Sequence, residues 1–275
     1  MAHGVWQDRR QMFPQRIVCL TEETTETLYL LGEERRIVGI SGFTVRPPRA
    51  RKEKPKVSAF TSARIDKIRE LQPDLVLGFS DLQADIAAEL IRHGIAVHVF
   101  NQRSIAGILQ MISMLGGMVG CAAKAAELID TIEAGLAGIR AAAALLPQRP
   151  RVYFEEWDTP QISAIQWVSE LVELAGGSDC FPELAQESLG KNRIIADPLE
   201  VPRRAPQIIF GSWCGKKFCP ETVAGRPGWG DVPAVRGGEL HEIKSPIILQ
   251  PGPAALTDGV QALHVHIAKW AAARD

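Results

Sequence analysis

The sequence predicts an α/β protein of two similar lobes, each built on a mostly parallel sheet, joined by one long helix with a ligand cleft between the lobes. Short β-branched runs alternate with segments of helical spacing, and this alternation starts again after Pro150. Between the halves, residues 122–146 contain no proline and carry apolar residues at helical spacing. We place the amino-terminal lobe at residues 16–116, the linking helix at 117–150 and the carboxyl-terminal lobe at 151–275.

In the first half, strands are predicted where β-branched and apolar residues run together between turn residues. Helical segments are predicted where apolar residues recur at helical spacing and a glycine or proline follows. The predicted strands are residues 16–20, 37–41, 74–78 and 95–100, and the predicted helical segments end at Gly32, Leu71 and His93. Because strands and helices alternate, the sheet is expected to have helices on both faces.

The second half repeats this order. Strands are predicted at residues 151–154 and 206–212, and a helix at 167–175 is stopped by two glycines. Residues 65–80 also resemble residues 198–213, because prolines, an apolar strand and a terminal glycine fall near the same register. We interpret this internal likeness as two related lobes.

A proline-rich segment, residues 245–253, precedes the final predicted helix. Its prolines predict a stiff, extended path that stays out of a sheet interior. Such a segment is either a rigid rim for the cleft or an ordinary connector.

Composition excludes several partners. The formal net charge is -1, from 31 basic and 32 acidic residues, so no long-range field attracts nucleic acid or an anionic membrane. Residues 1–16 lack the apolar core of a secretory signal, and no apolar run is long enough to cross a bilayer. We expect a monomer that is cytoplasmic as written, or periplasmic if an upstream signal is missing.

Catalytic motifs are missing from the sequence. It has no phosphate-binding loop, no dinucleotide-binding glycine motif and no nucleophile elbow. Cys214 and Cys219 have no second Cys or His pair to complete a zinc site, and His264 and His266 are expected on different sides of a helix. The sequence therefore predicts no catalytic residues, no metal site and no cofactor.

One alternative keeps an enzymatic role open. Lys216 and Lys217 follow Cys214 closely and would lower its thiolate pKa. A cytosolic enzyme or sensor that uses Cys214 is therefore a second hypothesis, beside a structural or ligand-lining thiol.

The candidate ligand-binding residues are those that follow the predicted strands. In open α/β sheets, ligands bind outside the carboxyl ends of the strands. Aromatic residues recur at these positions, and large flat side chains suit a bulky, partly apolar ligand. The candidates are Phe43, Thr44, Phe60, Phe79, Ser80, Asp81, Gln102, Arg103, Glu156, Trp157, Trp213 and Cys214.

Two stretches of the first half carry a family resemblance. Residues 56–66, from Lys-Val-Ser-Ala-Phe to Ile-Asp, and residues 71–79, Leu-Gln-Pro-Asp-Leu-Val-Leu-Gly-Phe, resemble the iron-siderophore and vitamin B12 class of ABC-transporter substrate-binding proteins. The resemblance extends over nearly all of the chain from Arg16 and is closest to the B12-binding members. It implies two α/β lobes joined by one long helix, and binding without covalent chemistry.

The resemblance also implies roles for particular residues. Phe60 stands where B12-binding members place an aromatic ring against the corrin, and Asp66 where they place an acidic residue that docks on the permease. At the second docking position this chain has Leu199, with Glu200 beside it. The resemblance implies a small-molecule metal chelate and an ABC permease as partners.

Within this class, the residues favour a corrinoid. Haem carriers use an axial Tyr or His, but Tyr29 and Tyr153 fall inside a predicted helix and a predicted strand. Arg46, Arg103 and Lys216 are candidates for holding an anionic ferric siderophore, which is the second ligand hypothesis. A corrinoid supplies its own metal ligands and needs aromatic walls and amide hydrogen bonds, so cobalamin or a related corrinoid is the predicted ligand.

Overall fold

The computed structural model describes residues 12–274, which form two compact units. Of these residues, the first unit contains 12–102 together with 106–131, and the second contains 103–105 together with 132–274. Both units are α/β, as predicted. None of the helices within residues 12–274 has the length and apolar character needed to cross a membrane.

The first unit contains a five-stranded sheet in the order β3-β2-β1-β4-β5, with every pair parallel. Apolar side chains of β1 alternate between its two faces, because successive residues of a strand point in opposite directions. On one face Val18 packs with Ile68 and Leu90, so α3 and α4 cover that side. The strands are β1 (Ile17–Cys19), β2 (Ile37–Ser41), β3 (Lys56–Ser58), β4 (Leu75–Phe79) and β5 (Val97–Phe100).

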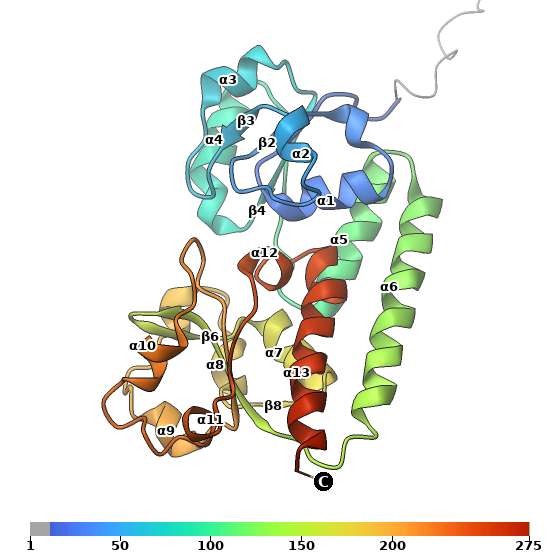
Figure 1. Cartoon of the computed structure of the whole chain (residues 1–275). Coiled ribbons are helices and arrows are strands. Elements are labelled where there is room, and N and C mark those ends of the chain that lie inside the picture. Colours follow the sequence, from blue (N-terminus) through green and yellow to red (C-terminus); the bar gives the residue numbers. More distant parts are fainter. Residues whose placement is uncertain (1–11, 275) are drawn as a thin grey trace, which may run out of the picture. The chain divides into compact units, whose positions relative to one another are not determined.

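Helices connect these parallel strands, which need crossover connections. Figure 1 shows them around the sheet of the first unit, in blue to green. The connecting helices are α1 (Glu22–Leu30), η2 (Glu34–Arg36), α2 (Ala50–Glu53), α3 (Ile65–Glu70), η3 (Asp81–Gln83) and α4 (Ala84–Arg92), and α5 (Ile105–Met118) follows the last strand.

The second unit is built around its central strand β6. This strand pairs in parallel with β9 and β8 and antiparallel with β7, and β10 adds to β9 in parallel. The sheet is therefore mostly parallel, as predicted. Its strands are β6 (Arg151–Asp158), β7 (Gln161–Ser163), β8 (Ser178–Asp179), β9 (Ile208–Gly211) and β10 (Leu240–Glu242).

The core on one face of this sheet is aromatic. Tyr153 of β6 packs edge-on against Phe181 and Trp229, with ring centroids 5.5 Å and 6.2 Å away. The helices of the unit are α7 (Gln166–Leu174), α8 (Pro182–Ala185), η4 (Gly190–Arg193), α9 (Glu200–Arg204), α10 (Pro220–Ala224), α11 (Pro233–Gly237), α12 (Ser245–Ile248), η5 (Ala255–Gly259) and α13 (Val260–Ala272).

The long helix predicted between the halves is α6 (Ala122–Ala143). It is continuous over 22 residues, about 33 Å at the rise of an α-helix. The division between the units falls within it, after Thr131. Buried Ala125 lies in its first part, and buried Ile132 and Leu136 lie in the part that belongs to the second unit.

The predicted internal likeness is confirmed at the start of each unit. Arg16 Nε donates to the carbonyl of Gln72 at 3.0 Å, and Arg151 Nε donates to the carbonyl of Ala205 at 3.0 Å. Gln72 and Ala205 both adopt the left-handed conformation, with φ of 46° and 47°. A proline follows each of them.

The residue after each proline, Asp74 or Gln207, also bonds to the backbone of the arginine. Asp74 Oδ1 accepts a hydrogen bond from the backbone N–H of Arg16 at 2.9 Å, and Gln207 Oε1 accepts one from that of Arg151 at 2.9 Å. The turn before β4 and the turn before β9 are thus the same structure, built with different side chains.

Two sequence predictions were wrong in detail. The strand predicted at 151–154 continues to Asp158, because its second half pairs with β7, which the sequence analysis did not predict. The segment predicted to be extended from Ser245 begins with the helical turn α12, because Pro246 occupies a first-turn position where a missing N–H costs nothing.

Candidate ligand-binding site

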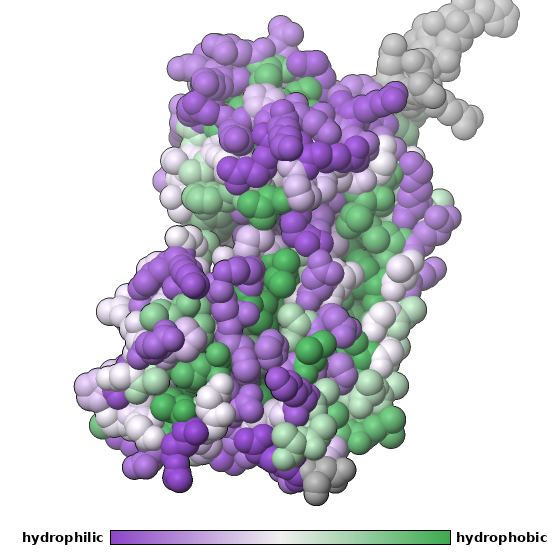
Figure 2. All heavy atoms as spheres, in the orientation of Figure 1, coloured by the Kyte–Doolittle hydropathy of each residue, from purple (hydrophilic) through white to green (hydrophobic). Residues whose placement is uncertain are grey.

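The carboxyl edge of the first sheet exposes apolar side chains. Phe43 follows β2 with 52% of its surface exposed, and Leu82 follows β4 with 49% exposed. Phe60 is half-buried, whereas Phe79 is 4% exposed and belongs to the core. Figure 2 shows hydrophobic residues at the end of this unit where Figure 1 labels β4, while hydrophilic residues cover the region around α2 and α3.

Gln83 fixes this edge. Its side-chain oxygen accepts from the backbone N–H of Phe79 at 2.9 Å, and its side-chain amide donates to the carbonyl of Phe60 at 2.8 Å. Ser80 has a φ of 64°, and its hydroxyl accepts from the backbone N–H of Leu82 at 3.3 Å. The amide of Gln83 is buried, so these bonds hold Phe60 and the end of β4 together. Sequence analysis missed Gln83, because an isolated polar residue near a helix start carries no distinctive pattern.

Other predicted residues of this unit differ in exposure. Asp81 is exposed at the start of η3, and Gln102 is buried after β5. Thr44 is fully buried, and its hydroxyl has no hydrogen-bond partner within residues 12–274. Buried polar atoms are normally hydrogen-bonded, so the Thr44 hydroxyl is a group that a ligand or an ordered water would satisfy.

Carboxyl groups are buried directly after β1. Glu23 is 1% exposed and accepts a hydrogen bond from the Thr21 hydroxyl at 2.6 Å. Burial raises the pKa of Glu23 to about 8, and the neighbouring Glu22 adds to that rise. Burial also raises the pKa of Glu22. The end of β1 therefore holds a carboxylic acid that is largely neutral at pH 7.

The second unit buries a carboxylate that pairs with an arginine. Glu155 is fully buried in β6, and Arg226 donates to both of its oxygens, at 2.6 Å and 2.9 Å. The Trp213 indole and the Tyr153 hydroxyl each donate to it at 3.0 Å. Trp213 is only 3% exposed and packs edge-on against Phe218 at 5.0 Å, so most of its ring is covered by the core.

Glu156 and Trp157 lie inside β6 rather than beyond its end, contrary to the prediction. Both are half-buried. Arg193, which is 1% exposed, donates to the Glu156 carboxylate at 2.6 Å. The Trp157 indole donates to the carbonyl of Thr159 at 3.0 Å. Arg103 belongs to the second unit, where it donates to the carbonyl of Ser188 at 3.4 Å.

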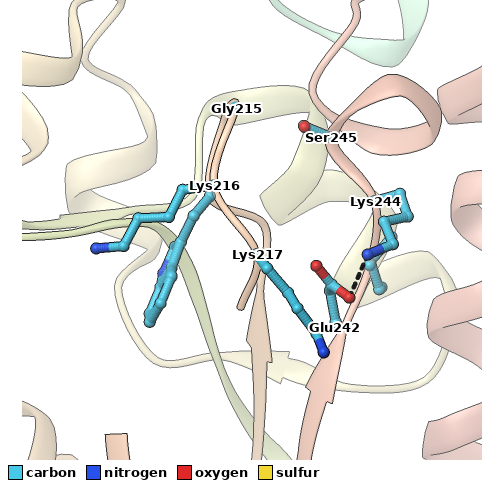
Figure 3. Close-up of a pocket in the computed structure, with 8 residues that line it drawn as sticks. Gly215, Lys216, Lys217, Glu242, Lys244 and Ser245 are labelled. Carbon is cyan, nitrogen blue, oxygen red and sulfur yellow. Dashed lines mark hydrogen bonds and ion pairs between the residues drawn. The ribbon is translucent and has the colours of Figure 1, made fainter. Parts of the chain in front are cut away.

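A basic pocket lies at the carboxyl ends of β9 and β10, with a volume of about 260 Å³. Figure 3 shows its walls: the loop after Trp213 on one side, and Glu242 with the segment after β10 on the other. Lys216 donates to Asp158 at 2.5 Å, and its ammonium group lies 4.8 Å from the centre of the Trp213 ring. Cys214, the candidate thiol, is exposed in the same loop.

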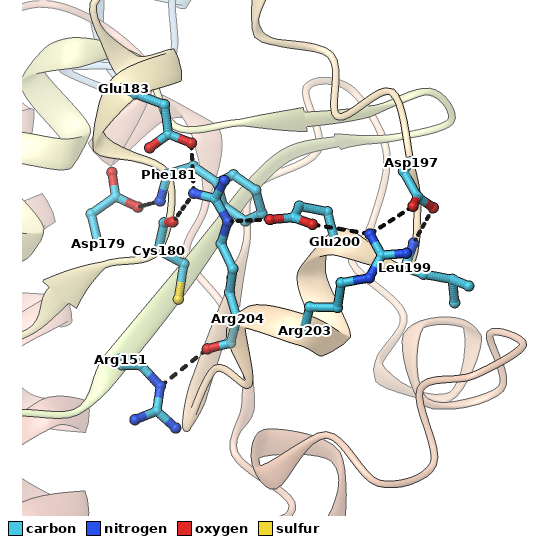
Figure 4. Close-up of polar contacts among 10 residues, drawn as sticks. All are labelled: Arg151, Asp179, Cys180, Phe181, Glu183, Asp197, Leu199, Glu200, Arg203 and Arg204. Atoms are coloured by element: carbon cyan, nitrogen blue, oxygen red, sulfur yellow. Dashed lines mark hydrogen bonds and ion pairs between the residues drawn. The ribbon is translucent and has the colours of Figure 1, made fainter.

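The two residues predicted to dock on a permease have different surroundings. The Asp66 side chain is 93% exposed, and its contact with Arg69 is 3.9 Å long. Glu200 instead accepts from Arg204 at 3.0 Å and from Arg203 at 3.1 Å, within the charged network that Figure 4 shows. Leu199 is 44% exposed beside it.

Comparison with known proteins identifies the family. Residues 17–247 match the model of the periplasmic binding protein family. The chain belongs to this family. A cobalamin-binding protein of Halobacterium salinarum is 26% identical over 253 residues, which is 86% of this chain and 67% of that protein.

Solved structures share the fold. An ABC transporter substrate-binding protein of Listeria monocytogenes EGD-e has a TM-score of 0.78 at 19% identity, over 94% of this chain and 99% of that one. A periplasmic heme-binding protein of Roseiflexus sp. RS-1, in its apo form, has a TM-score of 0.77 at 22% identity, over 92% and 99%. The family match makes this chain a periplasmic binding protein, and these solved structures share its fold.

Proposed function

We propose that this protein binds cobalamin or a related corrinoid reversibly, as the substrate-binding component of a transport system, and does no covalent chemistry on it. The observation that carries the proposal is the apolar edge of the first sheet, where Phe43 and Leu82 are exposed and Gln83 fixes Phe60 in place. A large ring system with its own metal ligands needs such apolar walls. A curated relative that binds cobalamin supports this choice.

Charge pairing weighs against a ferric catecholate, which needs unpaired cations. Of the three basic residues considered for that role, Arg46 pairs with Glu26 at 2.7 Å, and Lys216 pairs with Asp158. Arg103 donates to a backbone carbonyl. The siderophore hypothesis therefore has weaker support than the corrinoid.

Tyrosine positions weigh against haem. The Tyr29 hydroxyl donates to Glu53 at 2.8 Å, and the Tyr153 hydroxyl donates to buried Glu155. Each would have to leave a carboxylate partner to reach an iron atom. The sequence has only these two tyrosines, so an axial tyrosine is unfavourable here.

Calorimetry and absorption spectra test the proposal. We expect cyanocobalamin to bind the purified protein stoichiometrically, and haemin and a ferric catecholate to bind more weakly. Phe60→Ala should weaken corrinoid binding about tenfold, because a buried aromatic contact is lost. Leu145→Ala, at an exposed leucine after α6, is the matched control and should bind normally. Stoichiometric uptake of haemin or ferric catecholate without corrinoid binding would overturn the proposal.

The Cys214 hypothesis has its own test. Alkylation of the exposed Cys214 thiol should leave corrinoid binding intact, and the bound corrinoid should be recovered unchanged after long incubation. Thiol-dependent conversion of the ligand would instead support an enzyme.

A further inference from the structure

The pocket at the ends of β9 and β10 is too small for a whole corrinoid. Its volume is about 260 Å³, whereas pockets that enclose a complete drug-sized ligand hold about 300–1,000 Å³. It lies at the edge of the sheet where ligands bind in open α/β folds. A space of this size and place fits one substituent of a larger molecule.

The lining of the pocket carries more positive than negative charge. Three lysines line it, with Glu242 as the single carboxylate among the lining residues. Lys216 is paired with Asp158, and Lys244 with Glu242. Lys217 makes no ion pair or hydrogen bond within residues 12–274. Its positive charge contributes to lowering the pKa of two carboxyl groups, Glu242 and the exposed Glu221.

The loop that carries Lys217 is anchored on both sides. Phe218 is 2% exposed, and its backbone N–H donates to Glu242 Oε1 at 3.2 Å. Trp213 is held by the core before the loop. Gly215 turns the chain with a φ of 72°, a conformation that favours glycine. Figure 3 shows Lys217 and Lys244 coming from opposite sides of Glu242. The anchored loop therefore holds Lys217 at the pocket, and among the three lysines that line the pocket only Lys217 has no ion-pair partner within residues 12–274.

We infer that this pocket binds one anionic oxygen group of the ligand through Lys217 and Lys244. A single unpaired lysine matches a monoanion, and an ammonium group binds phosphate or carboxylate oxygens through charge-assisted hydrogen bonds. If the proposed function holds, the group is the phosphodiester of the cobalamin nucleotide loop. Cobinamide has the same ring and no phosphodiester, so this pocket would make the protein prefer cobalamin to cobinamide.

The experiment compares three ligands on matched variants. Cyanocobalamin carries the phosphodiester, dicyanocobinamide lacks it, and haemin carries carboxylates instead. We expect Lys217→Gln to lower the affinity for cyanocobalamin about tenfold and to leave that for dicyanocobinamide unchanged. Lys269→Gln on α13 makes the same charge change outside the pocket and should affect neither ligand. Higher salt should weaken cyanocobalamin binding to the wild type more than to Lys217→Gln.

A second readout uses inorganic phosphate with no corrinoid present. Millimolar phosphate should raise the melting temperature of the wild type more than that of Lys217→Gln/Lys244→Gln. Equal losses for both corrinoids, or no loss, would overturn the pocket assignment and leave the proposed function standing. Absence of corrinoid binding with a lysine-dependent phosphate effect would overturn the function alone. A lysine-dependent loss seen with haemin only would assign the pocket to carboxylates.

Discussion

The two units begin their sheets with the same structure and end them with different chemistry. Arg16 and Arg151 each hold a left-handed turn through its carbonyl oxygens, with nearly identical distances. At the opposite edge, the neutral amide of Gln83 fixes the first sheet, whereas the ion pair of Glu155 and Arg226 fixes the second. The amino ends of the strands thus carry a shared supporting frame. The two units differ in the groups at the carboxyl ends of the strands, where α/β proteins bind ligands.

This difference extends to charge. In the first unit the buried carboxyl of Glu23 is held neutral by its raised pKa. In the second unit Glu155, Glu156 and Asp158 each have an Arg or Lys partner. One edge therefore offers apolar and neutral groups to a ligand, and the other offers paired charges with a spare lysine.

The largest expected effect comes from breaking the charged cluster. Arg226→Ala leaves the fully buried Glu155 without its cation, which should cost about 3–5 kcal/mol in the free energy of unfolding. Gln83→Ala, its neutral counterpart, should cost about 1–3 kcal/mol, since it leaves the backbone N–H of Phe79 unbonded. Urea denaturation measures both. The double variant Glu155→Gln/Arg226→Met should recover much of the loss, and equal costs for Arg226→Ala and Gln83→Ala would contradict the comparison.

The next effect is the pH dependence that Glu23 of the first unit contributes. Glu23 has a pKa of about 8 when folded, against 4.5 for an unburied Glu. Between these pH values the unfolded chain loses this proton and the folded chain keeps it. The free energy of unfolding should therefore fall as pH rises through this window, and level off above it.

Glu23→Gln tests this assignment. It should flatten the pH profile between pH 5 and 8 and stabilise the protein at pH 8, measured by denaturant titration at several pH values. Glu89→Gln, on the exposed surface of α4, is the control and should keep the wild-type slope. A slope that survives Glu23→Gln would assign the titration to another group.

Much of the fold could be predicted from the sequence, because the parallel strands are buried apolar runs bounded by glycine and proline. The strands at residues 17–19, 37–41 and 75–79 follow that pattern. The strand β7 and the extension of β6 to Asp158 could not be predicted, because Glu156 and Asp158 are polar residues stabilised there by Arg193 and Lys216. These partners are distant in sequence and carry no local signal.

The site was predicted as a set of strand ends, and this placed Phe43 and Phe60 at an edge that is accessible. Trp213 was predicted to line the site because it follows a predicted strand, yet its indole faces a buried carboxylate and its ring packs in the core. Sequence position after a strand does not determine the direction of a side chain. Direct contact of these residues with a ligand stays a prediction.

A smaller effect should come from the supporting frame. Arg16→Ala and Arg151→Ala each remove hydrogen bonds to turn carbonyls from exposed side chains, and each should cost about 1–2 kcal/mol. Because the two arginines share no partner, the costs should add within about 0.5 kcal/mol in the double variant. Thermal and urea unfolding check this. Clearly unequal costs would show that the two turns are alike in geometry and unlike in energy.

The smallest effect on stability and ligand affinity is expected at Asp66 of the first unit and Glu200 of the second. Here the comparison of the two units concerns partner binding. Asp66 is almost fully exposed, while Glu200 is held by Arg203 and Arg204. Charge reversal at either position should leave corrinoid affinity and melting temperature nearly unchanged, because exposed ion pairs contribute little to stability.

Docking on a permease should depend on Asp66 and Glu200 to different degrees. Paired charges at an interface mainly orient docking. The Asp66 carboxylate is almost fully exposed and has one long contact with Arg69, whereas that of Glu200 accepts from Arg203 and Arg204. We therefore expect Asp66→Lys to reduce corrinoid-dependent growth more than Glu200→Lys, when each is expressed as the native-length chain and localised by cell fractionation. Asp85→Lys, at an exposed acidic residue of α4, is the control. If the protein fractionates with the cytoplasm, as predicted, and neither reversal affects growth, neither residue docks on a permease. Equal losses of growth at Asp66 and Glu200 would instead show that a partner displaces Arg203 and Arg204 from Glu200 on binding.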